Sequence, residues 1–163
     1  MSSTPAPVRK ALKSQYHAAL KMLEQTIENC PDPLWADSTP TNPYWLVAYH
    51  ALFFTHLYLV QNEAAFRPWE KHRPGYQSME QSREKKPYSK AELLEYCGFC
   101  TDMIDQAIDT LDLDHPESGF SWYQVPKLEH QLVNIRHLQH HTAQLADRLR
   151  NADGLGTRWV KNG

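Results

Sequence analysis

Hydrophobic residues recur every three or four positions in several long stretches of the chain, which is the spacing of one face of an α-helix. The first stretch, between Pro5 and Cys30, predicts a helix with Thr4 as its N-terminal cap and Pro5 as its first residue. Its apolar positions are Val8, Leu12, Tyr16, Ala19, Leu20, Leu23 and Ile27. Pro31 and Pro33 end this helix and open a turn-rich connector.

A second helix is predicted from Asn42, as the cap, and Pro43, as the first residue, to about Asn62. The run from Tyr44 to Val60 contains no formally charged residue, so this helix is expected to be the most buried one. A membrane span is the competing interpretation. The run is shorter than the ~20 apolar residues that a bilayer needs, and it includes two histidines, which favours a buried helix.

Two further amphipathic stretches follow a polar segment. A capping box at Ser89 predicts a helix from there to about Asp112. A last stripe from Leu128 to Leu149 predicts a helix that ends before Gly154. These helices together indicate an all-α fold, an antiparallel four-helix bundle in which residues 1–163 form a single domain.

The long loop at about 63–88, between the second and third predicted helices, is polar and punctuated by prolines. Loops of this length are usually functional lids or poorly ordered segments. The sequence leaves two alternatives open, a lid over a functional site and a solvated linker. Phe66 and Trp69 are the residues that could anchor part of it on the helices.

The overall composition excludes several classes of protein. The net charge of −2 argues against the broad basic surface that nucleic-acid binding requires. Three cysteines do not support a disulfide framework, and the N-terminus has no apolar signal segment, so the expected location is the cytoplasm. Cys97 and Cys100 lie on the apolar stripe of the third predicted helix, and we expect buried, reduced thiols rather than a redox or zinc site there.

Histidine is unusually frequent, with nine in the chain. His137 and His141 are one helical turn apart, so their rings rise on one face and can bind one ion. A solvated helix face is the alternative for this pair. His50 lies in the uncharged helix and needs a partner, either a hydrogen-bonding group or a metal shared with the last helix. His140 points elsewhere, and His56 is expected to be a core histidine or one that supports a ligand.

These residues resemble the DinB-like superfamily, the DinB/YfiT-like metalloenzymes. The resemblance consists of a histidine in the middle of the second helix, in Ala48–Phe53, and a His-x-x-x-His pair followed by a glutamine in the last helix, in Arg136–Leu145. Where the family often has Arg-Gly after the last histidine, this chain has Thr142-Ala143. The resemblance implies a divalent metal ion, zinc or nickel first and iron or manganese next, whose ligands are His50, His137 and His141.

Some branches of this family use the metal to activate a small thiol such as mycothiol or bacillithiol. The first function hypothesis is therefore a metal-dependent enzyme, a thiol S-transferase or a hydrolase acting on a small molecule, with Gln144 or Tyr49 as candidates to orient a ligand. The second is a non-catalytic metal-binding or stress-response bundle that acts through a homodimer or partner contacts. A third is a helical interaction module without metal. No acid–base pair is recognisable, so the catalytic residues stay undefined.

Overall fold

The computed structural model describes residues 3–163 and shows, within them, helices and no strand. The α-helices are α1 (Ala6–Glu28), α2 (Asp32–Ala36), α3 (Tyr44–Tyr58), α4 (Met79–Ser82), α5 (Lys90–Thr110) and α6 (Lys127–Asp153), and Glu63–Ala65 form a 3₁₀ turn. The all-α class predicted from the sequence is confirmed. The short helices α2 and α4 lie in the connectors and were not predicted.

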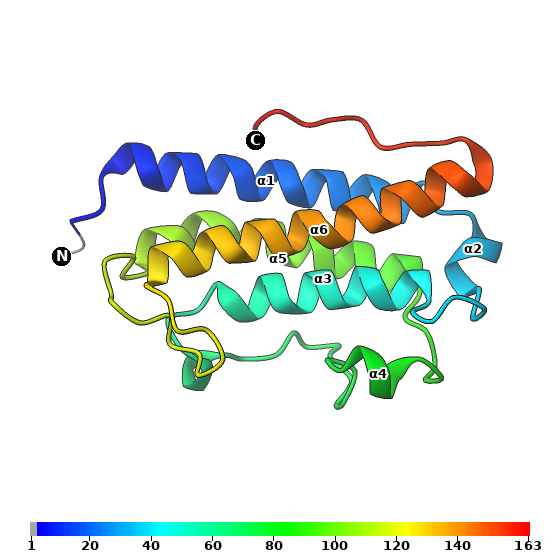
Figure 1. Cartoon of the computed structure of the whole chain (residues 1–163), viewed down its shortest axis with the longest axis horizontal. Coiled ribbons are helices and arrows are strands. Elements are labelled where there is room, and N and C mark those ends of the chain that lie inside the picture. The colour runs from blue at the N-terminus through cyan, green and yellow to red at the C-terminus, as the bar shows by residue number, and fades with distance from the viewer. Residues whose placement is uncertain (1–2) are drawn as a thin grey trace.

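The four long helices lie side by side, with α1 and α6 running in one direction and α3 and α5 in the other (Figure 1). The most extensive packing is between α1 and α5 and between α3 and α6, which are antiparallel pairs. The neighbours α1 and α6 are parallel, as are α3 and α5, so these two pairs differ from the antiparallel arrangement expected from the sequence. This arrangement is possible because the segment between α3 and α5 runs back along the molecule, so that both helices start at the same end (Figure 1).

Helix α3 is the most buried element, as its uncharged sequence predicts. All its residues are buried except His50 and Phe54, which are half-buried. Among the described residues, no helix is long and apolar enough to span a membrane. The two exceptions lie one helical turn apart on the same side of α3, and they mark the position of the candidate site.

The predicted helix starts are partly wrong. The N-cap of α1 is Pro5, without a side-chain cap, because the hydroxyl of Thr4 donates to Asp114 Oδ1 instead, at 2.6 Å. The N-cap of α3 is Pro43. Asn42, predicted as that cap, instead accepts hydrogen bonds from Arg83 and Arg148.

These two hydrogen bonds bring distant parts of the chain to the start of α3. Arg83 Nε donates to Asn42 Oδ1 at 3.1 Å, and Arg148 Nη1 donates to the Asn42 carbonyl at 2.7 Å. The second bond ties the last third of α6 to the beginning of α3. Long-range donors of this kind cannot be recognised from the local sequence.

At its other end, α3 stops at Tyr58 rather than at the predicted boundary near Asn62. The carbonyls of Val60 and Gln61 accept hydrogen bonds from Lys127 Nζ at 2.7 and 2.9 Å, so these residues leave the helical path. Lys127 is completely buried. Its ammonium therefore joins the start of α6 to the chain just beyond α3.

The predicted boundaries of the other two helices are confirmed. Ser89 and Glu92 form the capping box of α5, in which the Ser89 side chain accepts from the Glu92 amide at 3.1 Å. Helix α6 ends at Asp153, and its C-cap Gly154 has a φ of 74°, in the left-handed region that favours glycine.

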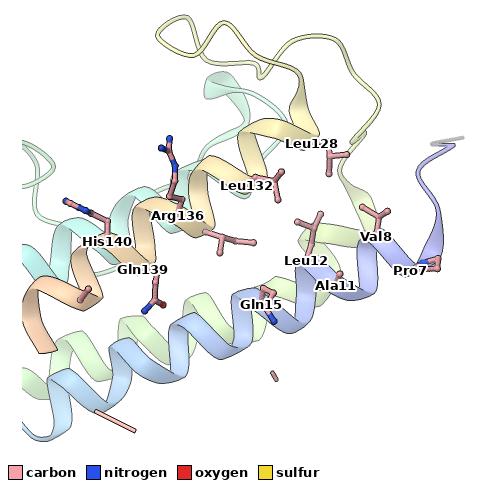
Figure 2. A pocket seen from close by; sticks show the side chains of 12 residues that line it. Pro7, Val8, Ala11, Leu12, Gln15, Leu128, Leu132, Arg136, Gln139 and His140 are labelled. Atoms are coloured by element: carbon pink, nitrogen blue, oxygen red, sulfur yellow. The ribbon is translucent and has the colours of Figure 1, made fainter. Parts of the chain in front are cut away.

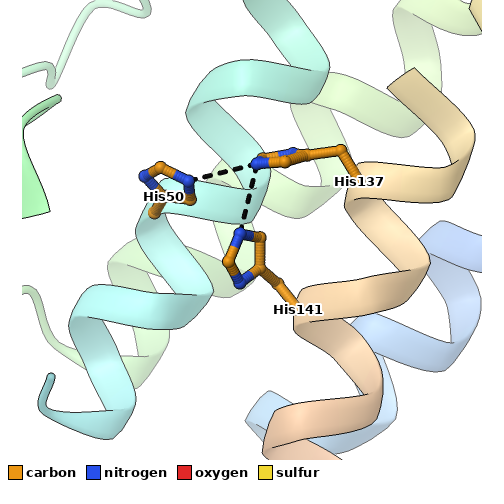
Figure 3. Close-up of side chains that lie close together, drawn as sticks. All are labelled: His50, His137 and His141. Carbon is orange, nitrogen blue, oxygen red and sulfur yellow. Dashed lines mark hydrogen bonds between the residues drawn. The ribbon is translucent and has the colours of Figure 1, made fainter. Parts of the chain in front are cut away.

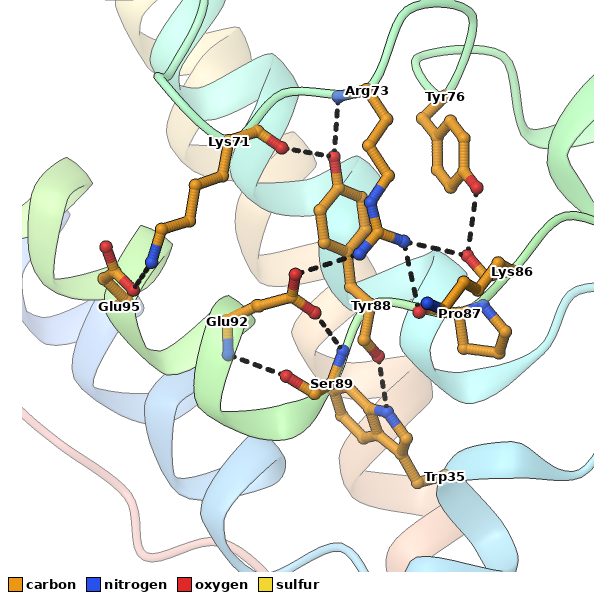
Figure 4. Close-up of polar contacts among 10 residues, drawn as sticks. All are labelled: Trp35, Lys71, Arg73, Tyr76, Lys86, Pro87, Tyr88, Ser89, Glu92 and Glu95. Atoms are coloured by element: carbon orange, nitrogen blue, oxygen red, sulfur yellow. Dashed lines mark hydrogen bonds and ion pairs between the residues drawn. The ribbon is translucent and has the colours of Figure 1, made fainter.

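The segment between the 3₁₀ turn and α5 is anchored on the helices by a few buried residues, while many of its other side chains are exposed (Figure 4). Trp69 and Tyr88 are buried, and Trp35 Nε1 donates to the Tyr88 carbonyl at 2.9 Å. The Arg73 guanidinium lies 4.0 Å from the centre of the Tyr88 ring and pairs with Glu92 of α5 at 2.9 Å. These contacts anchor part of the segment on the helices, and a lid movement would have to break them.

Candidate metal centre

Three histidine rings from two helices meet at the α3/α6 seam (Figure 3). The four-residue spacing places His137 and His141 on the flank of α6 that faces α3, and His50 approaches from α3. His137 Nε2 lies 3.2 Å from His50 Nε2 and 3.1 Å from His141 Nε2. Within the described part of the chain, these residues form a group that could hold a metal ion, with their ligand atoms within 4.8 Å of one another.

The spacing of these nitrogen atoms fits a shared divalent cation. Imidazole nitrogens bind zinc at 2.0–2.1 Å, so two of them in adjacent coordination positions lie about 2.9–3.4 Å apart. The observed separations of 3.1 and 3.2 Å fall in this interval. Without a shared cation or proton, the lone pairs of nitrogen atoms at this distance would repel one another.

The protonation pattern of His141 is also suitable. Its Nδ1 donates to Gln144 Oε1 at 2.8 Å, which leaves the lone pair of Nε2 directed at the other two rings. The Nδ1 atoms of His50 and His137 are buried and have no hydrogen-bond partner among the described residues. Of the two residues that the sequence suggested for orienting a ligand, Gln144 therefore contacts the group. Tyr49 does not, because its hydroxyl bonds to His72.

The environment keeps all three rings neutral at pH 7. Burial, together with the neighbouring imidazoles, lowers the pKa of His50 to about 3 and that of His137 to about 4. Burial also lowers the pKa of His141, and the hydrogen bond to Gln144 opposes this shift. Only neutral imidazole can bind a metal, so each ring is in its ligating form.

One side of the group is apolar. The Phe54 ring centre lies 4.7 Å from that of His50 and 5.6 Å from that of His137. No carboxylate or thiolate belongs to the group within the described residues. The protein therefore offers three ligands of one chemical kind, fewer than the four that usually close a structural zinc site.

Other histidines lie outside the group. His140 is exposed and lines a groove between α1 and α6. His56 is buried, with Nδ1 3.1 Å from the Tyr96 hydroxyl, which confirms the core alternative. His130, which the sequence did not single out, is completely buried, with its ring centre 4.6 Å from that of Tyr58.

The two cysteines of α5 behave as predicted. Cys97 and Cys100 are free and buried, and their thiols face the Leu20 and Leu52 carbonyls. Burial raises the pKa of Cys97 to about 12 and that of Cys100 well above its usual range. Thiols in this environment are unreactive, and they belong to the core.

Comparison with protein-family models, with curated proteins and with solved structures finds no match to this chain. The three-histidine group could hold a metal ion. Neither the identity of that ion nor an enzymatic activity can be taken from a relative.

Proposed function

We propose that the protein is a divalent-metal-dependent enzyme whose ion is held by His50, His137 and His141. The observation that carries this proposal is the meeting of their three neutral Nε2 atoms, with no carboxylate or thiolate joining them in the described residues. A three-ligand set leaves positions for a small substrate, whereas an ion that only clamps helices usually has four protein ligands. This difference favours the enzyme over the non-catalytic metal-binding alternative.

The proposed fold type is a four-helix bundle of the DinB-like superfamily, formed by the whole chain as one domain. Two features support this assignment. The four long helices follow the expected order, with the long connector between the second and third of them. The histidines also lie on the helices where the resemblance requires them, one on α3 and two on α6.

When bound, a divalent ion with neutral imidazole ligands keeps its full charge and makes a water or thiol more acidic. The chain's own residues prepare this chemistry. Gln144 holds the His141 proton on Nδ1, burial keeps His50 and His137 uncharged, and Phe54 limits water on one side. Transfer of a small thiol of the mycothiol or bacillithiol type, or hydrolysis of a small substrate, fits these features. The resemblance implies zinc or nickel first and iron or manganese next, and imidazole ligands suit zinc, nickel and iron.

The proposal is tested by metal analysis followed by X-ray absorption spectroscopy. Protein purified without a tag and without chelator is expected to contain one divalent ion per chain, with nitrogen and oxygen ligands only. Addition of a small thiol is expected to introduce one sulfur ligand at about 2.3 Å. An ion whose ligands do not change with thiol or with other small anions would support the non-catalytic alternative. A chain that binds no divalent ion after reconstitution would refute the proposal.

A further inference from the structure

A row of aromatic rings leads away from the histidine group along α3. Phe54 lies one helical turn after His50, and the centre of its ring is 5.6 Å from that of Tyr58, one turn further on. The Tyr58 hydroxyl accepts a hydrogen bond from Trp122 Nε1 at 3.0 Å. His50 and Tyr58 are two helical turns apart, so the row extends about 11 Å along α3 from the histidine group.

The last ring of the row, Trp122, is exposed and at the same time fixed in place. The residue is 48% exposed. Its indole N–H is held by Tyr58, and the centre of its ring is 5.4 Å from that of the buried Phe120. A large ring that is already held loses little conformational entropy when another apolar group packs on it. The exposed surface of Trp122 therefore suits contact with a ligand.

The surface beside the histidine group is apolar on both helices of the seam. Helix α3 contains no formally charged residue, and only His50 and Phe54 of that helix are half-buried rather than buried. On α6, the half-buried Val133 lies one turn before His137 on the same flank. An apolar group would be favoured here, whereas a charged group would lose its hydration without gaining a partner.

We propose that the surface from Phe54 to Trp122 binds the apolar part of the substrate, and that the substrate is a small molecule in which a metal-binding head group carries an apolar tail. The inference rests on the proposed function, because the head group binds the ion held by the three histidines. The tail packs along Phe54 and ends on the indole ring of Trp122. Its length is set by the two helical turns between His50 and Tyr58, about 11 Å.

The groove between α1 and α6 is the competing place for such a tail (Figure 2). It has a volume of about 870 Å³ and is lined by apolar side chains such as Leu12 of α1 and Leu132 of α6. The histidine group lies at the other seam of α6, the one with α3 (Figure 3). The two places belong to different pairs of helices, so single substitutions can distinguish them.

Hydroxamates of increasing chain length test the inference on the zinc-loaded full chain, because their head group binds zinc through its oxygen atoms. Octanohydroxamate is expected to bind about fiftyfold more tightly than acetohydroxamate, which is about twofold for each added methylene group, as for a chain covered on one side. Trp122→Ala is expected to weaken octanohydroxamate binding about tenfold and to leave acetohydroxamate binding unchanged. Isothermal titration calorimetry measures these affinities.

Three further variants are the controls. Trp122→Phe keeps an aromatic ring and is expected to bind octanohydroxamate within about threefold of the wild type. Trp159→Ala removes a tryptophan that is 71% exposed and lies outside the row, and Leu132→Asp changes the groove. Both are expected to bind like the wild type. In NMR spectra, the indole N–H signal that both Trp122 variants lack is expected to shift with octanohydroxamate and not with acetohydroxamate.

Three results would contradict the inference. An affinity that does not rise with chain length, or an indole signal of Trp122 that does not shift, overturns it while acetohydroxamate binding still supports the proposed function. A chain-length gain that Leu132→Asp removes and Trp122→Ala retains places the tail in the groove and overturns it as well. If no hydroxamate binds the zinc-loaded protein, the proposed function fails and the inference fails with it.

Discussion

Helix α3 contributes one histidine to each of its two seams, and the two residues differ in what surrounds them. At the seam with α6, His50 faces the Nε2 atom of His137. At the seam with α5, His56 faces the Tyr96 hydroxyl and the Phe66 ring. Burial lowers the pKa of both, to about 3 for His50 and about 4 for His56. A low pKa therefore does not distinguish a candidate ligand from a core histidine, whereas the convergence of several lone pairs does.

The largest expected difference between the seams is in metal affinity. His137→Ala removes a ligand and is expected to reduce affinity more than about a hundredfold, because loss of an outer-shell partner alone costs 10–100-fold. His140→Ala on the same helix is the control and is expected to retain the ion. Elemental analysis and competition with a chelator provide the measurement. Equal metal retention in the two variants would show that the ion binds elsewhere.

The loss of stability on substitution is expected to be larger for His56 than for His50, the reverse of the order expected for metal affinity. In chelator, His56→Ala is expected to lower the free energy of unfolding by about 2–3 kcal/mol, since it leaves a cavity and an unpaired Tyr96 hydroxyl. His50→Ala is expected to cost less than about 1 kcal/mol under the same conditions, because the half-buried ring leaves little cavity. Urea denaturation measures both values. Loss of the metal ion from His56→Ala would contradict the separation of the two seams.

A smaller loss of metal affinity is expected on substitution of Gln144, the residue that fixes the tautomer of His141. Gln144→Ala frees the Nδ1 proton and is expected to weaken metal binding about tenfold, at the low end of the range for such partners because the side chain is exposed. Gln139→Ala is the matched control on the other flank of α6. Gln144→Glu, which keeps an acceptor, is expected to rescue binding. If the alanine variants have equal affinities, Gln144 has no role in positioning the ring.

The smallest difference between the seams is expected in acid sensitivity. Both pKa values lie below the value of about 6.5 of an unfolded histidine. Between about pH 6.5 and pH 4 the unfolded chain therefore binds more protons, so the free energy of unfolding falls as the pH falls and is insensitive to these groups above about pH 7. Urea denaturation of the metal-free protein at several pH values is expected to show this loss.

The variants extend this measurement to each seam. His50→Ala and His56→Ala are each expected to reduce, by a similar amount, the free energy of unfolding that is lost on acidification. A variant that leaves the acid loss unchanged would show that its histidine is not held neutral in the folded protein.

The parts of the molecule that could be predicted from sequence are those that depend on local spacing. The one-turn separation of His137 and His141 requires only a regular helix, and the Ser89 capping box acts within four residues. The partner of His50 could not be decided from spacing, because it depends on which helix packs against α3. The resemblance to a known family supplied that expectation, and the structure brings the three rings together.

The features that the sequence did not reveal arise from distant contacts. The early end of α3 depends on Lys127, which lies far along the chain. The packing of the segment before α5 depends on a cation–π contact between Arg73 and Tyr88 and on a hydrogen bond from Trp35. Composition alone makes this segment look solvated, because its polar residues outnumber the few aromatic ones that anchor it. Helices as short as α4 also have no periodicity to detect.

The two long basic side chains that join α6 to the ends of α3 have a consequence for metal exchange. Lys127 holds the carbonyls of Val60 and Gln61 beyond one end of α3, and Arg148 holds the carbonyl of Asn42 before the other. The histidine group lies between these two sets of hydrogen bonds, so α3 cannot slide along α6 without breaking them. The nitrogen spacing is thus set before an ion arrives, and little conformational entropy is lost on binding. Ions should therefore enter and leave through rapid rotation of the imidazole rings rather than through the slower movement of whole helices.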